Sequence, residues 1–366
     1  MLFGGFWTIL SLVAAVRAVA DPPLHLTIRT PDELYDATAL VATVRLKNVG
    51  NRTLRLLNDP YSVLTPHWET NIWDIRNGHG GVPEFNGVQV KWSPALAAAA
   101  QQYTVLVPGE SRTYTHKLGE KMYNFSRLGA PRTYTVLLGG SSRSFIHVPD
   151  NGVGDKLNLE TVTSKVEVLG TPSTIILGRT VPPVNTLRSP RLSKRINTFQ
   201  SCNADQVVNI SRAVFVAQQL VNESYHYLTF HATNCSYPRY ETWFGSWTKQ
   251  RADTVTSHYN HIRNGQLFSD TYNCSCDDPG IYAYVYPTEF GTIYLCSAFW
   301  SAPIQGTDSK AGTLIHESSH FIDNGGTQDF VYGQDGCKAL AIQNPLNATN
   351  NADSHEYFAE NNPYLN

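Results

Sequence analysis

Two histidines four residues apart, His316 and His320, enclose Glu317 in the sequence HESSH. On a helix, side chains four residues apart lie on the same face, where two imidazole nitrogens can hold one zinc ion. A catalytic zinc site keeps one position for water, so a third protein ligand is expected elsewhere in the chain. Glu317 is placed to accept a proton from that water and to pass it to a leaving amine. The pattern predicts a zinc hydrolase with one Zn2+ per chain.

The residues around this motif favour a helix. Polar residues 307–309 are suited to cap its start, and the Asn-Gly-Gly run at 324–326 is suited to end it. The glycines would turn the chain back sharply after the helix. This turn would bring Asp329 to the metal as an oxygen ligand and Tyr332 close to the substrate carbonyl.

One class of zinc protease is excluded by the residues after the motif. The metzincin extension requires glycine at position 323 and histidine at position 326, where this chain has Asp323 and Gly326. That class also has a methionine turn downstream, but the only methionines here are Met1 and Met122. The third ligand must therefore come from a different arrangement.

The combination of HExxH with GTxDxxYG resembles the signature of the deuterolysin, or aspzincin, family of fungal zinc endopeptidases. The resemblance runs from about Thr198 to the C-terminus, through PRYETWFGSW, YAYVYPTEFGTIYLCSAFW, GTDSKAGTLIHESSHF and NADSHEYFAENNP, and is strongest to the lysine-specific members from mushrooms. It implies a zincin-like α+β domain, with helices and a small sheet around the HExxH helix. The roles it implies are zinc binding by His316, His320 and Asp329, general acid/base catalysis by Glu317, and oxyanion stabilisation by Tyr332.

Two acidic residues near the C-terminus bear on substrate choice. Asp353 and Glu356 lie three residues apart, so on a helix both carboxylates project from one face. The resemblance implies that they form a primed-side pocket for lysine, with Tyr282 as an aromatic wall, and that the enzyme cleaves on the amino side of lysine. From the residues alone, Asp353 or Glu356 could instead be the third metal ligand, or the pair could be a solvated helix face. His355 and Glu360 are expected at the surface.

Composition divides the chain of 366 residues into two unlike parts. All six cysteines lie from Cys202 onward. From Thr198 to the end there are 7 Lys and Arg against 16 Asp and Glu, a net charge of −9, whereas the preceding part has a net charge of +7. This complementarity favours association of the two parts.

We expect three segments: a signal peptide (1–20), a β-rich propeptide with a basic linker (21–197), and a zinc metalloendopeptidase domain (198–366). The apolar run at 2–16 is short for a membrane span and precedes Ala-Val-Ala at 18–20, a cleavage pattern that predicts secretion. In the Pro-rich, basic linker, Lys194-Arg195 is typical of a dibasic processing site.

The propeptide is expected to be an all-β, antiparallel sandwich. Short alternating or β-branched runs are separated by Gly, Pro, Asn and Asp, at residues 24–29, 40–46, 134–138, 165–169 and 174–177. The segment has no cysteine and no cluster of ligand-type residues. We expect it to act as inhibitor and folding chaperone of the enzyme without placing a thiolate on the zinc.

In the C-terminal part, apolar spacing predicts helices over about 204–230 and 240–262. Aromatic and β-branched residues predict a hairpin of 282–286 with 292–295. A strand beside the metal helix commonly pairs with the substrate backbone, and this hairpin is the candidate, although a purely structural hairpin fits the same pattern.

Six cysteines in an exported domain of this size imply three disulfides. The family resemblance implies Cys202–Cys274 and Cys276–Cys296, and the remaining Cys235 and Cys337 are expected to form a third. Glycosylation sequons occur at Asn51, Asn124, Asn209, Asn222, Asn234, Asn273 and Asn347.

Two other functions are compatible with these patterns. One is a broad-specificity endopeptidase of the deuterolysin type, and the other is a secreted binding or defence protein with a vestigial zinc site. The presence of Glu317 argues against a vestigial site, since loss of that residue is the simplest way to inactivate one. The expected partners are lysine-containing proteins or peptides and the chain's own propeptide, with no nucleic acid and no membrane.

Overall fold

The structure is a computed structural model that describes residues 22–34, 39–119, 121–125, 133–149, 159–169, 173–175, 197–230, 237–264 and 267–365. The predicted signal peptide, the processing site Lys194-Arg195 and Cys235 lie outside these residues. The described residues between 22 and 175 are called the N-terminal part, and those between 197 and 365 the C-terminal part.

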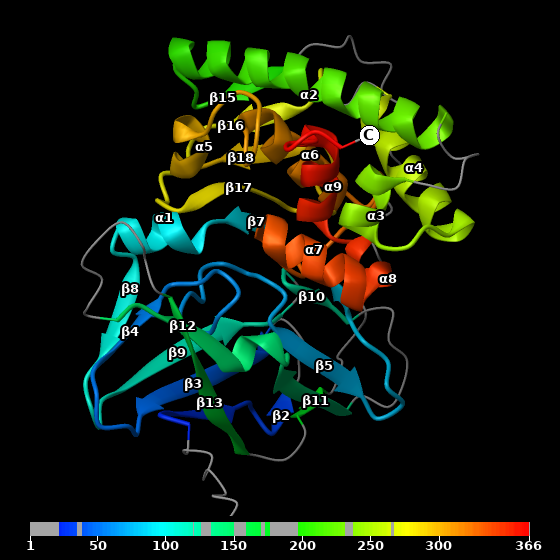
Figure 1. Ribbon diagram of the computed structural model, residues 1–366. Helices are drawn as coiled ribbons and strands as arrows, with labels where there is room; N and C mark the ends of the chain where they lie inside the picture. Colours follow the sequence, from blue (N-terminus) through cyan, green and yellow to red (C-terminus); the bar gives the residue numbers. More distant parts are fainter. Residues whose placement is uncertain are drawn as a thin grey trace, which may run out of the picture.

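The N-terminal part consists mainly of strands (Figure 1). The strands that form its two larger sheets are β1 (Leu24–Arg29), β2 (Glu33–Leu34), β3 (Val41–Asn48), β4 (Leu54–Leu57), β5 (Trp73–Asn77), β8 (Tyr103–Leu106), β9 (Ser111–Lys117), β11 (Thr133–Leu138), β12 (Ser144–His147), β13 (Glu160–Leu169) and β14 (Ser173–Ile175). One sheet has the order β8-β4-β12-β13-β1-β3-β9 and the other β2-β14-β11-β5. The remaining elements are β6 (Glu84–Phe85), β7 (Gln89–Trp92), α1 (Pro94–Ala99), β10 (Tyr123–Asn124) and the short 3-10 helix η2 (Ser141–Arg143).

Side chains from the two larger sheets meet in one hydrophobic core. In β1, alternate residues such as Leu26 and Ile28 are fully buried, as the period of two requires. They belong to the same buried cluster as Trp73 of β5 and Tyr134 of β11. Strand β1 pairs antiparallel with β3 but parallel with β13, and β14 pairs parallel with β2, so the expectation of an antiparallel sandwich was wrong at these two pairs.

The C-terminal part combines helices with a small sheet, so the chain as a whole has a mixed α+β composition, as predicted. Its strands are β15 (Thr198–Gln200), β16 (Thr271–Asn273), β17 (Ile281–Val285) and β18 (Thr292–Leu295). Its helices are α2 (Ala204–Phe230), α3 (Pro238–Phe244), α4 (Lys249–Arg263), α5 (Ser297–Ser301), α6 (Lys310–His320), α7 (Gly333–Gln343), α8 (Pro345–Ala348) and α9 (Ala352–Glu360). None of the helices in the described ranges is both long enough and apolar enough to cross a membrane.

The helix predicted over 204–230 is confirmed as α2, but the one predicted over 240–262 is two helices. The chain breaks at Gly245, which has φ of +77°. A Cβ at that position would lie 2.2 Å from the carbonyl oxygen of Ala341, so the close approach of α7 and the backbone angle both require glycine. The predicted hairpin is confirmed as β17 and β18, which pair antiparallel.

One strand of the N-terminal part belongs to the sheet of the C-terminal part. The order of that sheet is β15-β16-β18-β17-β7, and β7 pairs antiparallel with β17. In Figure 1, β7 and α1 lie along the junction between the strand-rich part and the helices. The region around β7, α1 and the start of β17 forms a separate buried apolar cluster.

The bridges Cys202–Cys274 and Cys276–Cys296 are both present in the structure. The predicted third bridge, Cys235–Cys337, is not among the bridges of the described residues. Cys337 is a free, fully buried thiol on α7, where the side-chain amide of Asn351 contacts its sulfur at 3.4 Å. Burial raises the pKa of this thiol well above its usual value, as is typical of an unreactive core cysteine.

Candidate active site and metal centre

Helix α6 carries the two histidines and is buried between elements of the C-terminal part and strand β7. The side chain of Ser309 caps the helix by accepting the backbone N–H of Gly312 at 2.9 Å. Every residue of α6 is buried, because the helix packs against α2, α9 and the sheet. It ends at His320, earlier than the predicted Asn-Gly-Gly run, and Phe321 adopts a non-helical conformation.

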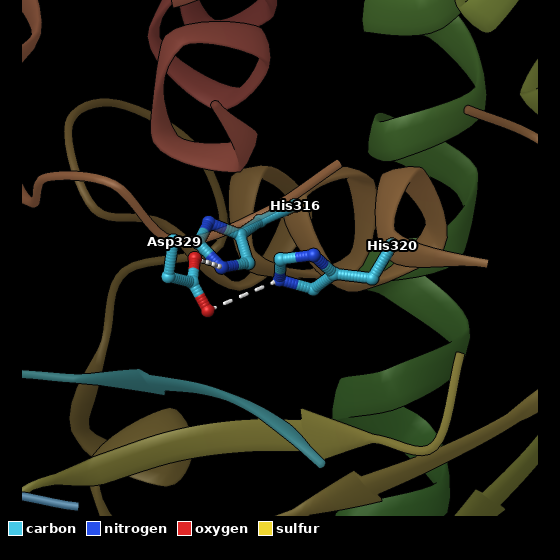
Figure 2. A group of neighbouring side chains, drawn as sticks. All are labelled: His316, His320 and Asp329. Atoms are coloured by element: carbon cyan, nitrogen blue, oxygen red, sulfur yellow. Dashed lines mark ion pairs between the residues drawn. The ribbon is translucent and has the colours of Figure 1, made fainter. Parts of the chain in front are cut away.

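The turn after α6 returns Asp329 to the two histidines, as Figure 2 shows. Nε2 of His316 lies 3.2 Å from Oδ1 of Asp329, and Nε2 of His320 lies 3.4 Å from Oδ2 of the same carboxylate. Gly326, with φ of +59°, provides the turn, and the backbone of Gln328 then pairs with residues 350–352. All three side chains are inaccessible to solvent.

These three residues fit a tetrahedral zinc ion. Both Nε2 atoms and Oδ1 of Asp329 are buried and have no hydrogen-bond partner among the described residues, so they are free to be ligands. Nδ1 of His320 lies 2.8 Å from the carbonyl oxygen of Thr327, an arrangement that places the ring proton on Nδ1 and leaves Nε2 unprotonated. Burial alone would raise the pKa of the Asp329 carboxyl, but His320 and His316 lower it well below its usual range.

A second group of possible ligands lies on the other side of the His316 ring. Nδ1 of His316 is 2.8 Å from Oδ1 of Asp353 and 3.3 Å from Oε2 of Glu356, both on α9. A carboxylate in this position fixes the ring orientation of a metal-binding histidine through its other nitrogen. This second group shares His316 with the first but has no second histidine, and it faces a lysine ammonium.

That ammonium belongs to Lys91 of β7, whose side chain is only 2% exposed. Its Nζ pairs with Oε2 of Glu356 and lies 3.7 Å from Oδ1 of Asp353 and 3.6 Å from Oδ1 of Asp308. It also lies 5.1 Å from the centre of the Tyr282 ring. Burial alone would lower the pKa of Lys91, but the carboxylates of Glu356, Asp353 and Asp308 raise it well above its usual value. The residues predicted to bind lysine thus surround a lysine of the same chain.

Glu317 and Tyr332 lie 15 residues apart in the sequence. Both border the candidate metal centre. Both carboxylate oxygens of Glu317 are buried without a hydrogen-bond partner among the described residues. Burial raises the pKa of Glu317 to about 7, against the opposing effect of His316 and His320. The ring of Tyr332 lies parallel to that of His316, with 6.5 Å between the ring centres, and its hydroxyl donates to the carbonyl oxygen of Val90 at 2.6 Å.

The expectation that His355 and Glu360 lie at the surface was wrong, since both are on the buried α9. His355 is fully buried, with its Nε2 3.0 Å from Nδ1 of His258. Glu360 accepts hydrogen bonds from the backbone N–H of Ser309 at 2.8 Å and from its hydroxyl at 2.7 Å. It therefore supports the cap of α6, a role that its position in the sequence does not indicate.

Sequence reasoning missed three residues that border the site: Asp308, Lys91 and Tyr61. Asp308 was assigned only to the helix cap, yet its carboxylate faces Lys91 and accepts the Tyr357 hydroxyl at 2.7 Å. The hydroxyl of Tyr61 donates to Oδ2 of Asp329 at 2.7 Å. The one available signal was Lys91 itself, a lysine within the strand-like run VQVKW of the propeptide of an enzyme expected to be lysine-specific.

Comparison with known proteins identifies the family of the chain. The sequence profile of the aspzincin M35 family, described as "Lysine-specific metallo-endopeptidase", matches residues 229–360. The peptidyl-Lys metalloendopeptidase of Armillaria mellea is 39% identical, with 96% of this chain and 95% of that protein covered, and that of Grifola frondosa is 38% identical, with 95% and 96% covered. A solved zinc peptidase from Grifola frondosa is 48% identical over 45% of this chain and all of its own, with a TM-score of 0.43. The chain therefore belongs to the aspzincin M35 family and is a zinc metalloendopeptidase.

Proposed function

We propose that the protein is a secreted proenzyme whose mature domain (198–366) hydrolyses peptide bonds on the amino side of lysine. The observation that carries this proposal is the contact of one carboxylate with two different groups. Asp353 lies 2.8 Å from the candidate metal ligand His316 and 3.7 Å from a buried lysine ammonium. A lysine side chain in this pocket brings its own backbone to the candidate metal centre.

In this proposal, one zinc ion per chain is held by His316, His320 and Asp329. The support is that these side chains converge and that Nε2 of both histidines and Oδ1 of Asp329 are buried and make no hydrogen bond within the described residues. When bound, zinc lowers the pKa of a water toward about 7 and polarises a carbonyl group. The alternative ligands Asp353 and Glu356 are already paired with Lys91, which argues against their use for the metal.

Glu317 is the general acid/base in this proposal. Its carboxylate accepts a proton from the attacking water and then donates it to the amine that leaves. The carboxylate is fully buried and neither oxygen has a hydrogen-bond partner among the described residues, so both oxygens are free to take and release a proton. Tyr332 donates its hydroxyl hydrogen to the carbonyl oxygen of the scissile bond, where negative charge develops in the transition state.

The pocket formed by Asp308, Asp353, Glu356 and Tyr282 selects lysine. Three carboxylates and an aromatic ring surround a space in which Lys91 is almost inaccessible to solvent. A buried ammonium is stable only where charges of opposite sign compensate for its lost hydration. A neutral side chain in this pocket would leave the carboxylates unpaired, so the pocket favours lysine over apolar residues.

The remaining elements of the proposal concern the precursor. Residues 1–20 direct secretion, and cleavage after Lys194-Arg195 separates the propeptide from the mature domain. The propeptide acts as inhibitor and chaperone. Supporting this, β7 pairs with β17 beside the candidate active site, and the net charges of +7 and −9 are complementary.

A peptide digest tests the function directly. The mature domain, freed of the propeptide, is incubated with a mixture of peptides that place every amino acid on either side of a bond, and the products are identified by mass spectrometry. We expect almost all new amino termini to be lysine, and we expect a metal chelator to abolish cleavage. Cleavage without regard to lysine would favour the broad deuterolysin-type alternative, and no cleavage would favour a binding protein.

A further inference from the structure

The lysine of β7 lies in the candidate active site in the manner of a bound substrate. Strand β7 extends the sheet antiparallel to β17, with Lys91 opposite Ala283 and Val90 opposite Tyr284. The register shifts between Ile281 and Ala283, at the bulge that contains Tyr282. Lys91 is therefore held both by its backbone strand and by its charged side chain, which is how an extended peptide substrate binds at a sheet edge.

The peptide bond that precedes Lys91 is the one a lysine-directed enzyme would cut. Its carbonyl oxygen, on Val90, accepts the hydroxyl of Tyr332 at 2.6 Å. Tyr332 is the residue proposed to stabilise the oxyanion, and its ring lies against that of His316. Both sides of the Val90–Lys91 bond thus occupy the positions that the proposed function gives to the two sides of a scissile bond.

A tyrosine from another loop of the N-terminal part lies beside this bond. The hydroxyl of Tyr61 donates to Oδ2 of Asp329 at 2.7 Å and accepts the backbone N–H of Val90 at 2.9 Å. The backbone N–H of Tyr61 in turn donates to Oδ1 of Asp59 at 2.7 Å, which fixes the loop. The phenol oxygen therefore bridges a candidate metal ligand and the Gln89–Val90 amide, one residue before the Val90–Lys91 bond. The centre of the Tyr61 ring also lies 6.3 Å from that of Tyr332, whose hydroxyl contacts the Val90 carbonyl oxygen, so Tyr61 occupies the region beside that carbonyl.

We propose that β7 is a built-in pseudosubstrate: Lys91 fills the lysine pocket, and Tyr61 excludes water from the Val90–Lys91 bond so that the bond is bound but not cut. This inference rests on the proposed function, because it uses the same pocket and the same catalytic groups. It adds two specific predictions about the propeptide. Its affinity for the mature domain depends on the buried Lys91, and its resistance to cleavage at the Val90–Lys91 bond depends on the hydroxyl of Tyr61.

The first test measures the affinity of the two parts for each other. A recognition site for a site-specific protease is inserted in the linker of the full-length proenzyme carrying Glu317→Gln, and dissociation of the two fragments after cleavage is measured. We compare Lys91→Gln with Lys47→Gln, which changes an exposed lysine on β3. We expect Lys91→Gln to weaken binding at least 100-fold and Lys47→Gln to leave it unchanged. Equal affinities for the two variants would overturn the proposal.

The second test asks whether the Val90–Lys91 bond is cleaved when the hydroxyl of Tyr61 is removed. In proenzyme with an active Glu317, Tyr61→Phe should allow water to add across the Val90–Lys91 bond, giving a carboxylate on Val90 and a new amino terminus on Lys91. Mass spectrometry should find this terminus in Tyr61→Phe but not in Tyr103→Phe or in Tyr61→Phe combined with Glu317→Gln. An intact bond in an otherwise active Tyr61→Phe enzyme would overturn the role of Tyr61.

The outcomes separate this inference from the function on which it rests. If the mature domain cuts peptides without a preference for lysine, the proposed function fails first. If it prefers lysine but binds the Lys91→Gln and wild-type propeptides equally, the pseudosubstrate proposal fails and the proposed function stands. Thermal unfolding of each uncleaved variant shows whether a change in affinity results from loss of the fold, and Lys91→Arg, which keeps the charge, provides a second variant if Lys91→Gln does not fold.

Discussion

Asp353 holds Oδ1 of its carboxylate 2.8 Å from Nδ1 of His316, while the same atom lies 3.7 Å from the ammonium of Lys91. Its other oxygen accepts the backbone N–H of Gly333 at 2.8 Å, so the carboxylate is fixed at both ends. The candidate metal centre and the proposed lysine pocket therefore share one side chain. In the proposed function, recognition of the substrate and orientation of a metal ligand are coupled through it.

This sharing predicts that Asp353→Asn weakens metal binding as well as lysine preference. Loss of a carboxylate that orients a ligating histidine typically costs 10- to 100-fold in metal affinity. The matched control is Asp308→Asn, because the Asp308 carboxylate contacts Lys91 and the Tyr357 hydroxyl rather than His316. Both variants are dialysed against increasing concentrations of a chelator and their zinc content is measured. Their cleavage of lysine-containing peptides is measured in parallel. Equal zinc retention in the two variants would show that Asp353 serves the pocket alone.

Glu317→Gln should retain the metal and lose roughly 10²- to 10⁴-fold in kcat, because an amide cannot accept and return a proton. Zinc content and single-turnover rates of the mature domain provide the measurement. Glu289→Gln, at an exposed position, is the control and should remain fully active. Near-normal activity of Glu317→Gln would exclude this residue as the base.

Tyr332→Phe should lower kcat by roughly 10²-fold while changing KM little, since the lost hydrogen bond is made mainly to the charge that develops in the transition state. The position of its hydroxyl, 2.6 Å from the Val90 carbonyl oxygen, is the basis for this expectation. Steady-state kinetics on a peptide with a single Xaa-Lys bond measures kcat and KM separately. A rise in KM at constant kcat would instead assign Tyr332 to substrate binding.

His116 should make the N-terminal part sensitive to acid. It is 3% exposed on β9, next to the Trp73 ring, with Nε2 3.1 Å from the carbonyl oxygen of Val63, and burial lowers its pKa to about 4. Because this pKa lies below the value of about 6.5 in the unfolded chain, stability is complete above pH 6.5 and falls toward pH 4. The loss attributable to His116 is on the order of 3 kcal/mol.

The measurement is thermal unfolding of wild-type and His116→Gln proenzyme, both carrying Glu317→Gln, between pH 7 and pH 4. Burial raises the pKa of Asp59 to about 6, so its contribution has the opposite sign and is present in both proteins. The difference between the two pH profiles therefore isolates His116. Parallel profiles would show that His116 is not the responsible group.

The parts of the site that sequence predicted are those whose residues lie close together in the chain. His316, Glu317 and His320 share one helix, and Asp329 comes after it by a single turn, so spacing and glycines sufficed to bring them together. The boundary of α2 and the hairpin of β17 and β18 were predicted because their side-chain periodicity is regular.

The parts that sequence did not predict depend on contacts between distant segments. Lys91 and Glu356 are 265 residues apart, and Tyr61 and Asp329 are 268 apart, so no local pattern relates them. His355 was expected at the surface, but α9 packs against α6 and every one of its residues is buried. The break at Gly245 results from the close approach of α7, which is also a tertiary effect.

The central claim is that His316, His320 and Asp329 hold the metal, and an anomalous-scattering map recorded at the zinc edge from crystals of the proenzyme tests it most directly. We predict one peak about 2.0–2.2 Å from Nε2 of both histidines and from an oxygen of Asp329. A peak between Nδ1 of His316, Asp353 and Glu356, or no peak between the two histidines, would contradict it.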